Sequence, residues 1–330
     1  MNFLEINNLQ VEYRQKKQSV YAVRGASFAL QRGETFGIVG ETGAGKTTIA
    51  LSVMGLLPGS AAIPEGSVRL EDLELVGLND KTMQSVRGAK MAMIFQNPMS
   101  SLNPTINIEK QIAEGIRLHS WKRPDREELS GRIDELLTMV GIDPIMKHSY
   151  PHELSGGMKQ RVCIAIALAC NPELLIADEP TTALDVTIQA QVLELMNDLK
   201  RRTGMSMIMI THDFGIIARM CDKIAVMYMG TFVETGTWDD LFLTDRHHPY
   251  TEGLFGAIPN IKSGEKRLKP IPGMAGSNTT LQPGCVFADR CSKATEHCKN
   301  EKPGEIFEGT HMIRCHLFAE GGGDHAGTVD

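Results

Sequence analysis

"TFGIVGETGAGKTTIALSVMGLL", residues 35–57, begins as an apolar, β-rich run, passes through several glycines and continues as a segment that favours a helix. The stretch therefore predicts a strand, a loop and a helix in succession. Its loop fits the pattern G-x-x-x-x-G-K-[ST] from Gly40 to Thr47, in which backbone N–H groups converge on phosphate oxygens at the N-terminus of a helix. Average residue frequencies produce such a match by chance in about one per cent of chains of this length. The stretch predicts an α/β fold built around a phosphate-binding loop.

The side chains of this loop have separate expected roles. Lys46 would reach the β and γ phosphates of a nucleotide, and Thr47 would hold Mg²⁺. The nucleotide-binding residues predicted from the loop are Gly40, Gly43, Gly45, Lys46, Thr47 and Thr48.

A second apolar run, "ELLIADEP" at 173–180, is typical of a parallel strand buried on both faces, and it ends in two acids. The carboxyl ends of such strands are where open α/β sheets bind ligands. Asp178 is therefore predicted to coordinate Mg²⁺ through water, and Glu179 to act as the general base that polarises the attacking water. A solvated pair of acids is the alternative interpretation, which the phosphate-binding loop disfavours.

Two further strand ends carry polar side chains. "MSMIMITHD" at 205–213 is interpreted as a buried strand that ends before His212, and Gln96 follows the strand-like "KMAMIF". The imidazole of His212 could contact the γ-phosphate or the attacking water, although a histidine after a strand is more often a structural hydrogen-bonding group. Gln96 is similarly placed to contact Mg²⁺ or water.

The stretch "ELSGGMKQRVCIAIALAC" at 153–170 predicts a second helix whose N-terminus could hold an anion, with Ser155 as its N-cap. One bound nucleotide does not need two such sites from one chain. The simplest arrangement lets this helix bind the γ-phosphate of a nucleotide held by another subunit, so the sequence predicts a site shared across a dimer.

Six motifs now stand in a diagnostic order. They are "GETGAGKT", "FQ" at 95–96, "LSGGMKQR", "LLIADEP", "ALD" at 183–185 and "THD" at 211–213. Their order and spacing resemble those of the ATP-binding-cassette (ABC) ATPases, over residues 3 to about 240. The resemblance implies an α/β fold with a RecA-like P-loop core, an antiparallel β subdomain near the N-terminus and an inserted α-helical subdomain. The run "RIDELLTMVGI" agrees with a helix in that insertion, because Ile133, Leu136, Leu137 and Val140 would share one face before Gly141.

The resemblance also implies roles for residues outside the phosphate loop. Ser155, Gly156 and Gly157 would bind the nucleotide of the opposing subunit, and Asp185 would couple the two sites. An aromatic residue near the N-terminus would stack on adenine; Tyr13 is the preferred candidate and Tyr21 a competitor, because "RQKKQSV" makes the intervening loop long. No catalytic position departs from the family pattern, which implies an active half-site.

Other stretches indicate which branch of the ABC ATPases the chain resembles. "FQNPMSSLNP" at 95–104, "HHPYTEGLF" at 247–255 and a cysteine-bearing extension after "IPGM" resemble the importers of peptides and nickel. The branch implies uptake of di- or oligopeptides, with a nickel chelate or an oligosaccharide left open. His247 and His248 suggest a metal site, but adjacent histidines before "PY" in a linker are expected to be surface residues.

Four of the seven cysteines lie at 285, 291, 298 and 315, with spacing C-x5-C-x6-C-x16-C. Four thiols are a candidate ligand set for tetrahedral zinc or for a [4Fe–4S] cluster, and this spacing does not choose between them. The resemblance implies the iron–sulfur cluster, because similar extensions in this branch carry one; zinc and unmetallated thiols remain alternatives. Cys163, Cys170 and Cys221 lie in apolar or helical settings and are expected to be packing residues.

Domain boundaries follow from these motifs. We expect a cassette over residues 1–245 with its helical subdomain at about 97–165, a linker over 246–276, a Cys-rich metal-binding extension over 277–318 and a disordered tail over 319–330.

The partners expected of such a chain are those of an importer: a second ABC ATPase, more often a distinct homologue than a copy, two membrane permease subunits and, indirectly, a substrate-binding protein. The net charge is −6, no basic run is interleaved with aromatic residues, and the longest apolar run, "VCIAIALAC", is half a membrane span. We therefore expect no nucleic-acid partner, and a peripheral position on the cytoplasmic face of the inner membrane. Two rivals remain, namely a soluble cassette ATPase acting on ribosomes or DNA and an exporter ATPase with a regulatory C-terminal module.

Overall fold

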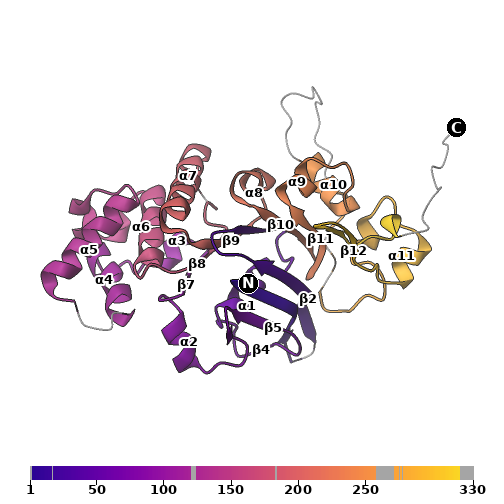
Figure 1. The fold of residues 1–330 in the computed structure, drawn as a ribbon, viewed down its shortest axis with the longest axis horizontal. Helices are drawn as coiled ribbons and strands as arrows, with labels where there is room; N and C mark the ends of the chain where they lie inside the picture. Colours follow the sequence, from indigo (N-terminus) through magenta and orange to yellow (C-terminus); the bar gives the residue numbers. More distant parts are fainter. Residues whose placement is uncertain are drawn as a thin grey trace.

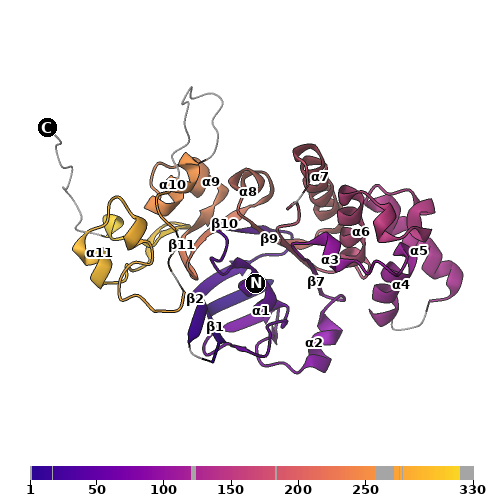
Figure 2. The ribbon, with the colours of Figure 1, turned by 180° about the vertical axis from the view of Figure 1, so that it is seen from behind.

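The structure is a computed structural model. It describes residues 2–16, 18–119, 124–182, 184–257, 271–274, 276 and 278–319. Figures 1 and 2 show a helical lobe at one end, a twisted central sheet, an antiparallel sheet on one side of it, and residues 278–319 at the opposite end from the helical lobe.

The central sheet has eight strands in the order β12-β13-β11-β10-β3-β9-β8-β7. Five neighbouring strands from β10 to β7 run parallel, whereas β11, β13 and β12 are antiparallel additions at one edge. The strands are β3 (Thr35–Val39), β7 (Met91–Ile94), β8 (Leu174–Asp178), β9 (Ser206–Thr211), β10 (Lys223–Tyr228), β11 (Thr231–Thr237), β12 (Ile306–Glu308) and β13 (His311–Ile313).

The second sheet is the antiparallel subdomain that the family resemblance implied. Its strand order is β2-β1-β5-β6, with β4 also paired to β1. The strands are β1 (Leu4–Arg14), β2 (Ser19–Leu30), β4 (Ala61–Ala62), β5 (Ser67–Leu70) and β6 (Leu73–Glu74).

Helices cover the central sheet and form the lobe at its β7 edge. The α-helices are α1 (Lys46–Val53), α2 (Asp80–Val86), α3 (Pro98–Ser101), α4 (Ile108–His119), α5 (Arg126–Met139), α6 (Gly156–Leu168), α7 (Val186–Thr203), α8 (Phe214–Met220), α9 (Trp238–Phe242), α10 (Pro249–Gly256) and α11 (Glu296–Asn300). Short 3-10 helices lie at Pro144–His148, Pro151–Glu153, Ala288–Arg290 and His316–Phe318.

The helical lobe matches the predicted insertion. Helices α4, α5 and α6 lie together at the left of Figure 1. The expected apolar face of α5 is buried from Ile133 to Val140, and Gly141 follows it with a φ of +70°, a left-handed conformation that glycine adopts without strain.

The parallel strands form the core of the cassette. All six residues of β9 are buried, which confirms that the methionine-rich run is a core strand. Successive side chains of β9 alternate between two apolar clusters, with Met207 and Met209 in one and Ile208 and Ile210 in the other. This alternation is expected of a strand covered on both faces.

The cysteines outside the extension lie where the sequence placed them. Cys221 is a core residue, and Cys163 and Cys170 are partly buried against the same apolar cluster. Burial raises the pKa of all three thiols, as expected for packing residues.

The C-terminal extension, residues 278–319, continues the central sheet. Strand β13 pairs with β11 so that Glu234 faces Ile313 and Thr235 faces Met312, and β12 pairs with β13. The segment expected to be a linker begins with helix α10, whose Tyr250 is fully buried. Apart from Ala319, the tail expected over 319–330 lies outside the described residues.

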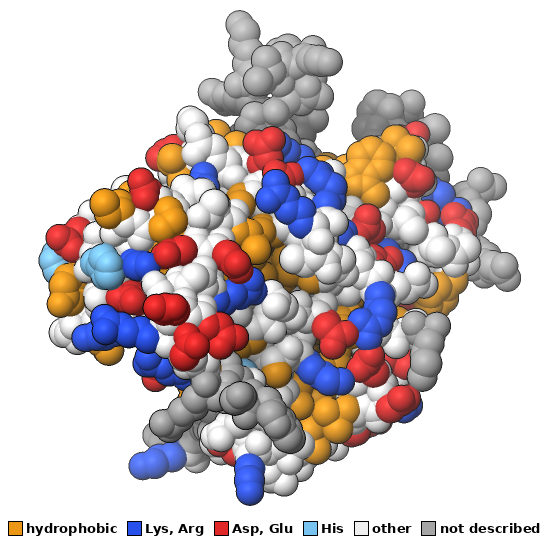
Figure 3. All heavy atoms as spheres, turned by 60° about the vertical axis from the view of Figure 1, so that its left-hand side comes forward, with side chains coloured by type: hydrophobic (Ala, Val, Ile, Leu, Met, Phe, Trp, Pro, Cys, Tyr) orange, Lys and Arg blue, Asp and Glu red, His pale blue; other side chains and the backbone are white. Residues whose placement is uncertain are grey.

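The lengths of the helices and the charges on the surface are relevant to the predicted membrane partners and to the predicted absence of a nucleic-acid partner. Among the described residues, no helix has both the length and the apolar character needed to span a membrane. Figure 3 shows Lys and Arg side chains intermixed with Asp and Glu on the face that brings the helical lobe forward. On this face the two signs of charge are therefore mixed.

Candidate functional site

The phosphate-binding loop joins β3 to α1 as the sequence predicts. Gly45 has a φ of +107°, and a Cβ atom there would lie 2.1 Å from the carbonyl oxygen of Ala22, so only glycine fits. The buried Lys46 donates hydrogen bonds from Nζ to the carbonyl oxygens of Gly40 (2.7 Å) and Glu41 (3.0 Å). Burial lowers the pKa of Lys46, and nearby carboxylates oppose that shift. The loop thus holds the Lys46 ammonium in place at its phosphate-binding site.

Asp178 is the last residue of β8 and is almost fully buried. Its Oδ1 atom makes no hydrogen bond within the part of the chain that the structure describes. Burial raises the pKa of Asp178, whereas the Thr47 hydroxyl favours the charged form. A buried acceptor without a donor is costly unless a cation or water occupies it, so this oxygen fits the predicted Mg²⁺ role.

Glu179 follows β8 with a φ of +47°, an unusual conformation for a residue with a side chain. Its Oε2 atom accepts hydrogen bonds from Gln96 Nε2 (2.8 Å) and Thr182 Oγ1 (2.9 Å), and its Oε1 atom lies 3.3 Å from His212 Nδ1. Burial alone would raise the pKa of Glu179, but these hydrogen bonds outweigh it and the pKa is lowered. The carboxylate is therefore held ionised and oriented.

The structure thus brings together Gln96, Glu179 and His212, which the sequence predicted separately. Gln96 and His212 are exposed, so both reach the carboxylate from the solvent side. Sequence reasoning missed Thr182, although its position three residues after Glu179, in "EPTT", places its hydroxyl within reach of the strand end.

Ser155 is the N-cap of α6, as predicted, and accepts a hydrogen bond from Met158 N at 3.3 Å. Ser155 and Gly156 are exposed, whereas Gly157 is buried, and a Cβ atom there would lie 2.6 Å from Ile188 of α7. Helix α6 lies in the helical lobe, whereas α1 lies below the centre of the molecule in Figure 1.

Asp185 is the N-cap of α7 and accepts a hydrogen bond from Ile188 N at 3.0 Å. This contact gives Asp185 a local structural role besides the coupling role that the family resemblance implied.

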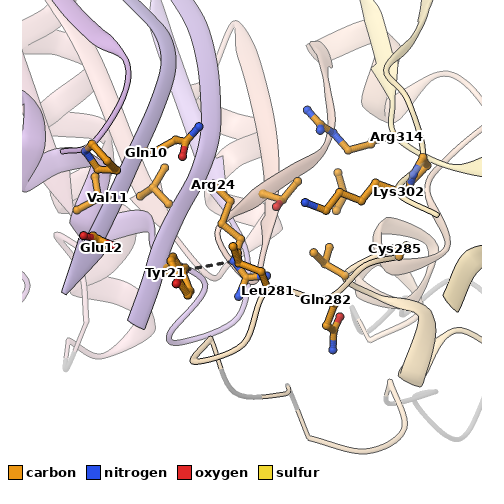
Figure 4. A pocket seen from close by; sticks show the side chains of 17 residues that line it. Gln10, Val11, Glu12, Tyr21, Arg24, Leu281, Gln282, Cys285, Lys302 and Arg314 are labelled. Atoms are coloured by element: carbon orange, nitrogen blue, oxygen red, sulfur yellow. Dashed lines mark hydrogen bonds between the residues drawn. The ribbon is translucent and has the colours of Figure 1, made fainter. Parts of the chain in front are cut away.

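The two candidates for stacking on adenine lie in different surroundings. The Tyr13 hydroxyl is 3.2 Å from Thr48 Oγ1 on α1, beside the phosphate-binding loop. Tyr21 instead lines a pocket between the antiparallel sheet and the C-terminal extension, where Figure 4 shows Arg24 reaching toward it. This placement favours Tyr13.

The expectation that His247 and His248 are surface residues is wrong, because they are 7% and 1% exposed. His248 Nδ1 accepts a hydrogen bond from Tyr250 N (3.0 Å) and caps α10, and burial lowers the pKa of His248 to about 4. Adjacent histidines before proline are typical of loops. Here the helix that follows packs into the core, so both imidazole rings are buried.

His247 belongs to a buried network around Glu234 of β11. Glu234 Oε1 is 2.7 Å from His247 Nδ1 and 2.9 Å from His311 Nε2. The other ring nitrogen of His247 lies 2.9 Å from the carbonyl oxygen of Thr244. Both nitrogens of His247 face oxygen atoms that accept hydrogen bonds, an arrangement that favours the ring with protons on both nitrogens.

This network joins the cassette to the extension. Glu234, His247 and His311 are the group of potential metal ligands, within the described residues, whose ligating atoms lie within 4.8 Å of one another. Their mutual hydrogen bonds account for the arrangement without a metal.

The four cysteines of the extension converge. Burial raises the pKa of Cys315 to about 12, and Cys285, Cys291 and Cys298 add to that shift. Backbone N–H groups donate to the sulfur atoms of Cys285, Cys291 and Cys315. Such N–H donors favour the thiolate form, which is the form in which cysteine binds metal ions.

The spacing of these thiols bears on which metal fits. Ligands of one tetrahedral zinc ion lie about 4 Å apart, because each Zn–S bond is about 2.3 Å long. In the described residues the four cysteines do not form a group with all sulfur atoms within 4.8 Å.

Comparisons with known proteins agree with this geometry. Residues 23–182 match the family model described as "ABC transporter", and residues 233–298 match "Oligopeptide/dipeptide transporter, C-terminal region". The oligopeptide transport ATP-binding protein AppD of Bacillus subtilis is 47% identical, over 98% of this chain and 99% of AppD. The dipeptide transport ATP-binding protein DppD of the same organism is 45% identical, over 95% of this chain and 94% of DppD.

A solved structure shares the cassette fold. The ATP-binding cassette MJ0796, in a dimeric post-hydrolysis state bound to ADP and Pi, aligns with a TM-score of 0.65 and 26% identity, over 71% of this chain and 98% of that one. The relatives that match almost the whole chain settle the family resemblance drawn from the motifs. The chain belongs to the ABC transporter family of ATP-binding proteins and carries the C-terminal region found in oligopeptide and dipeptide transporters.

Proposed function

We propose that this chain is the ATPase subunit of a membrane importer that takes up di- or oligopeptides. The observation that carries the proposal is the carboxylate of Glu179, held beside the phosphate-binding loop by Gln96, Thr182 and His212. The peptide assignment is supported by relatives, named for oligopeptide and dipeptide transport, that match the chain almost end to end.

The residues at the loop fit ATP and Mg²⁺. Lys46 would reach the β and γ phosphates, and Thr47, Asp178 and Gln96 would hold the ion, directly or through water. Mg²⁺, when bound, neutralises charge on those phosphates. Glu179 is the general base: its lowered pKa keeps it ionised at neutral pH, ready to accept the proton of the attacking water.

The same site is incomplete in one chain. Ser155 and Gly156 are exposed at the N-terminus of α6, in the helical lobe and away from α1. We assign Ser155, Gly156 and Gly157 to the nucleotide of an opposing subunit, and Asp185 to the coupling between the two sites. The opposing subunit is by default a distinct homologous ATPase, so that two ATP molecules close a heterodimer and hydrolysis reopens it.

The transport partners follow from the same proposal. Two permease subunits would receive the motion through the surface around Gln96 and the helical lobe, and a substrate-binding protein would deliver the peptide to them. The chain would sit peripherally on the cytoplasmic face of the inner membrane. Nucleic acid is not among its partners.

The extension would carry a [4Fe–4S] cluster on Cys285, Cys291, Cys298 and Cys315, with zinc as the alternative. Its role would be structural, because bound metal stabilises a short segment that has little apolar core of its own. Anaerobic purification followed by iron and acid-labile sulfide assay tests this. Cys298→Ser should lower both iron and sulfide, whereas Cys170→Ser should lower neither. Zinc without sulfide would rule out the cluster. If neither iron nor zinc were found, the four thiols would be unmetallated.

A pull-down of the tagged chain from native membranes in mild detergent tests the importer. Two multi-span subunits and a second cassette ATPase are the expected catch. If ribosomal or DNA-repair proteins were recovered without a membrane subunit, the result would contradict the importer and favour a soluble cassette ATPase. Exporter subunits would instead assign the extension a regulatory role.

A further inference from the structure

A residue of the C-terminal extension forms an ion pair with the phosphate-binding loop. Arg290 donates from Nη1 to Oε2 of Glu41 (2.7 Å) and from Nη2 to Oε1 (3.0 Å), a bidentate pair between residues 249 apart in the chain. Glu41 directly follows Gly40, the first glycine of the loop. The side chain of Arg290 is only 7% exposed, whereas that of Glu41 is 31% exposed, so the arginine is buried and the carboxylate remains partly open to solvent.

Arg290 is itself fixed from several sides. Its Nε atom donates to the carbonyl oxygen of Pro272 at 2.9 Å, and its guanidinium carbon lies 5.7 Å from the centre of the Tyr228 ring. It ends the short 3-10 helix Ala288–Arg290, immediately before Cys291. The arginine is therefore held in place by the fold of the extension.

Other residues beyond the core of the cassette hold the same loop. The backbone N–H of Glu41 donates to the hydroxyl of the buried Tyr250 at 3.0 Å. Asn278 Nδ2 lies 3.4 Å from the carbonyl oxygen of Gly43, and Asn278 O accepts from Tyr21 N at 2.9 Å. Figure 4 shows Leu281, a little further along the extension, beside Arg24 of β2.

The charge of Glu41 matters for nucleotide binding. Its backbone carbonyl accepts a hydrogen bond from Lys46, and its carboxylate is one of the charges that act on the Lys46 ammonium. The same ammonium is expected to bind the β and γ phosphates. An unpaired carboxylate at Glu41 would repel those phosphates and compete for their cation.

We propose that Arg290 is a positioning residue of the nucleotide site: its pairing with Glu41 cancels a negative charge on the phosphate-binding loop, so the C-terminal extension sets the loop's affinity for ATP. This inference rests on the ATP-binding function proposed above. Binding of MgATP by the unmodified chain tests that function, whereas the comparison between variants tests this inference.

A matched control exists in the same extension. Lys293 bonds to Glu252 of α10 at 2.9 and 2.7 Å, with side chains 48% and 39% exposed. This pair also ties the extension to the cassette, but it does not touch the loop. Lys293→Met therefore removes one ion pair of the extension and leaves the charge at Glu41 neutralised.

The experiment measures the Kd of the purified full chain for MgATP by calorimetry at low and high salt. Arg290→Met should weaken binding about tenfold at low salt, and the deficit should shrink at high salt because added ions screen the repulsion. Lys293→Met should bind like the unmodified chain. Glu41→Gln should bind at least as tightly, and Glu41→Gln combined with Arg290→Met should recover most of the lost affinity.

The recovery separates charge cancellation from a purely structural role. A folded Arg290→Met variant with unchanged affinity, or one whose deficit neither Glu41→Gln nor salt relieves, would overturn the proposal. If Arg290→Met does not fold, the double variant decides: affinity near that of the unmodified chain supports the proposal, and a tenfold loss overturns it. Thermal unfolding of each variant establishes which chains are folded.

Discussion

His212 Nδ1 lies 3.3 Å from Glu179 Oε1, and the two residues follow neighbouring parallel strands, β9 and β8. Gln96, which binds the other oxygen of the same carboxylate, follows β7, the next strand of the sheet. Parallel strands place their carboxyl ends at one edge, so residues far apart in the sequence meet there. The carboxylate proposed as the general base is thus oriented by its two neighbours.

The first prediction concerns that base. Glu179→Gln keeps the shape of the side chain but cannot accept a proton, so turnover should fall by about 100-fold or more while ATP still binds. Phosphate release and the Kd for MgATP measure the two effects. Glu173→Gln, at an exposed ion pair with Arg32, is the matched control and should hydrolyse ATP normally. Near-normal turnover of Glu179→Gln would remove Glu179 as the base.

Thr182 supplies the second prediction. Its hydroxyl donates to Glu179 at 2.9 Å and helps to lower the pKa of that carboxyl. Thr182→Val removes the donor, so the pKa of Glu179 should rise and the acid limb of the kcat profile should move to higher pH. Thr138→Val, which removes a hydroxyl on α5 that donates only to Asp134 O, should leave the profile in place. An unshifted acid limb in Thr182→Val would show that this hydrogen bond does not tune the base.

The third prediction concerns the buried pair of Glu234 and His247. Burial opposes the charge of His247, but the bond to Glu234 outweighs it and raises the pKa above its ordinary value of 6.5. Its contribution to stability is therefore complete below pH 6.5 and is lost as the pH rises through the raised pKa. Glu234 behaves oppositely: its pKa is lowered to about 2 from 4.5, so its contribution is complete above pH 4.5 and is lost as the pH falls toward 2.

His247→Phe tests this pair, since it removes the nearer of the two imidazole groups that contact the buried Glu234. His247→Phe should lower the free energy of unfolding by roughly 3 kcal/mol at pH 6, and by less at pH 9. Urea unfolding at both pH values measures the difference. His152→Phe, at an exposed histidine, should change stability little at either pH. Equal destabilisation by His247→Phe at both pH values would contradict a charged ring.

The parts of the site that sequence reasoning found were those fixed by local pattern. The phosphate-binding loop, the acids after β8 and the capped helix α6 each follow from residues close together in the chain. The strand ends were recognised one by one, so Gln96 and His212 were predicted only to lie near the ion, the γ-phosphate or the attacking water. Their contacts with Glu179 came from the structure.

The contacts that sequence reasoning missed join distant segments without a periodic signal. Arg290 and Glu41 are 249 residues apart, and Glu234 and His311 are 77 apart. Each pair depends on the C-terminal extension folding back onto the rest of the chain. Three-residue strands such as β12 and β13 are too short for an alternating pattern to reveal them. The burial of His247 and His248 was missed because it depends on the packing of α10 into the core, which a pair of histidines before proline does not reveal.

The last prediction concerns the pairing of the extension, through β13, with the central sheet. Met312 of β13 faces Thr235 across the seam with β11 and packs, 4% exposed, into the apolar cluster shared with the antiparallel subdomain. Met312→Ala should lower the free energy of unfolding of the cassette by roughly 2–5 kcal/mol, because it removes buried methylene groups and leaves a cavity. Met274→Ala, at a side chain 92% exposed, makes the same chemical change and should cost little. Urea unfolding followed by a probe in the helical lobe measures both variants. If Met312→Ala leaves the unfolding midpoint of the cassette unchanged, the extension folds independently of the sheet that it continues.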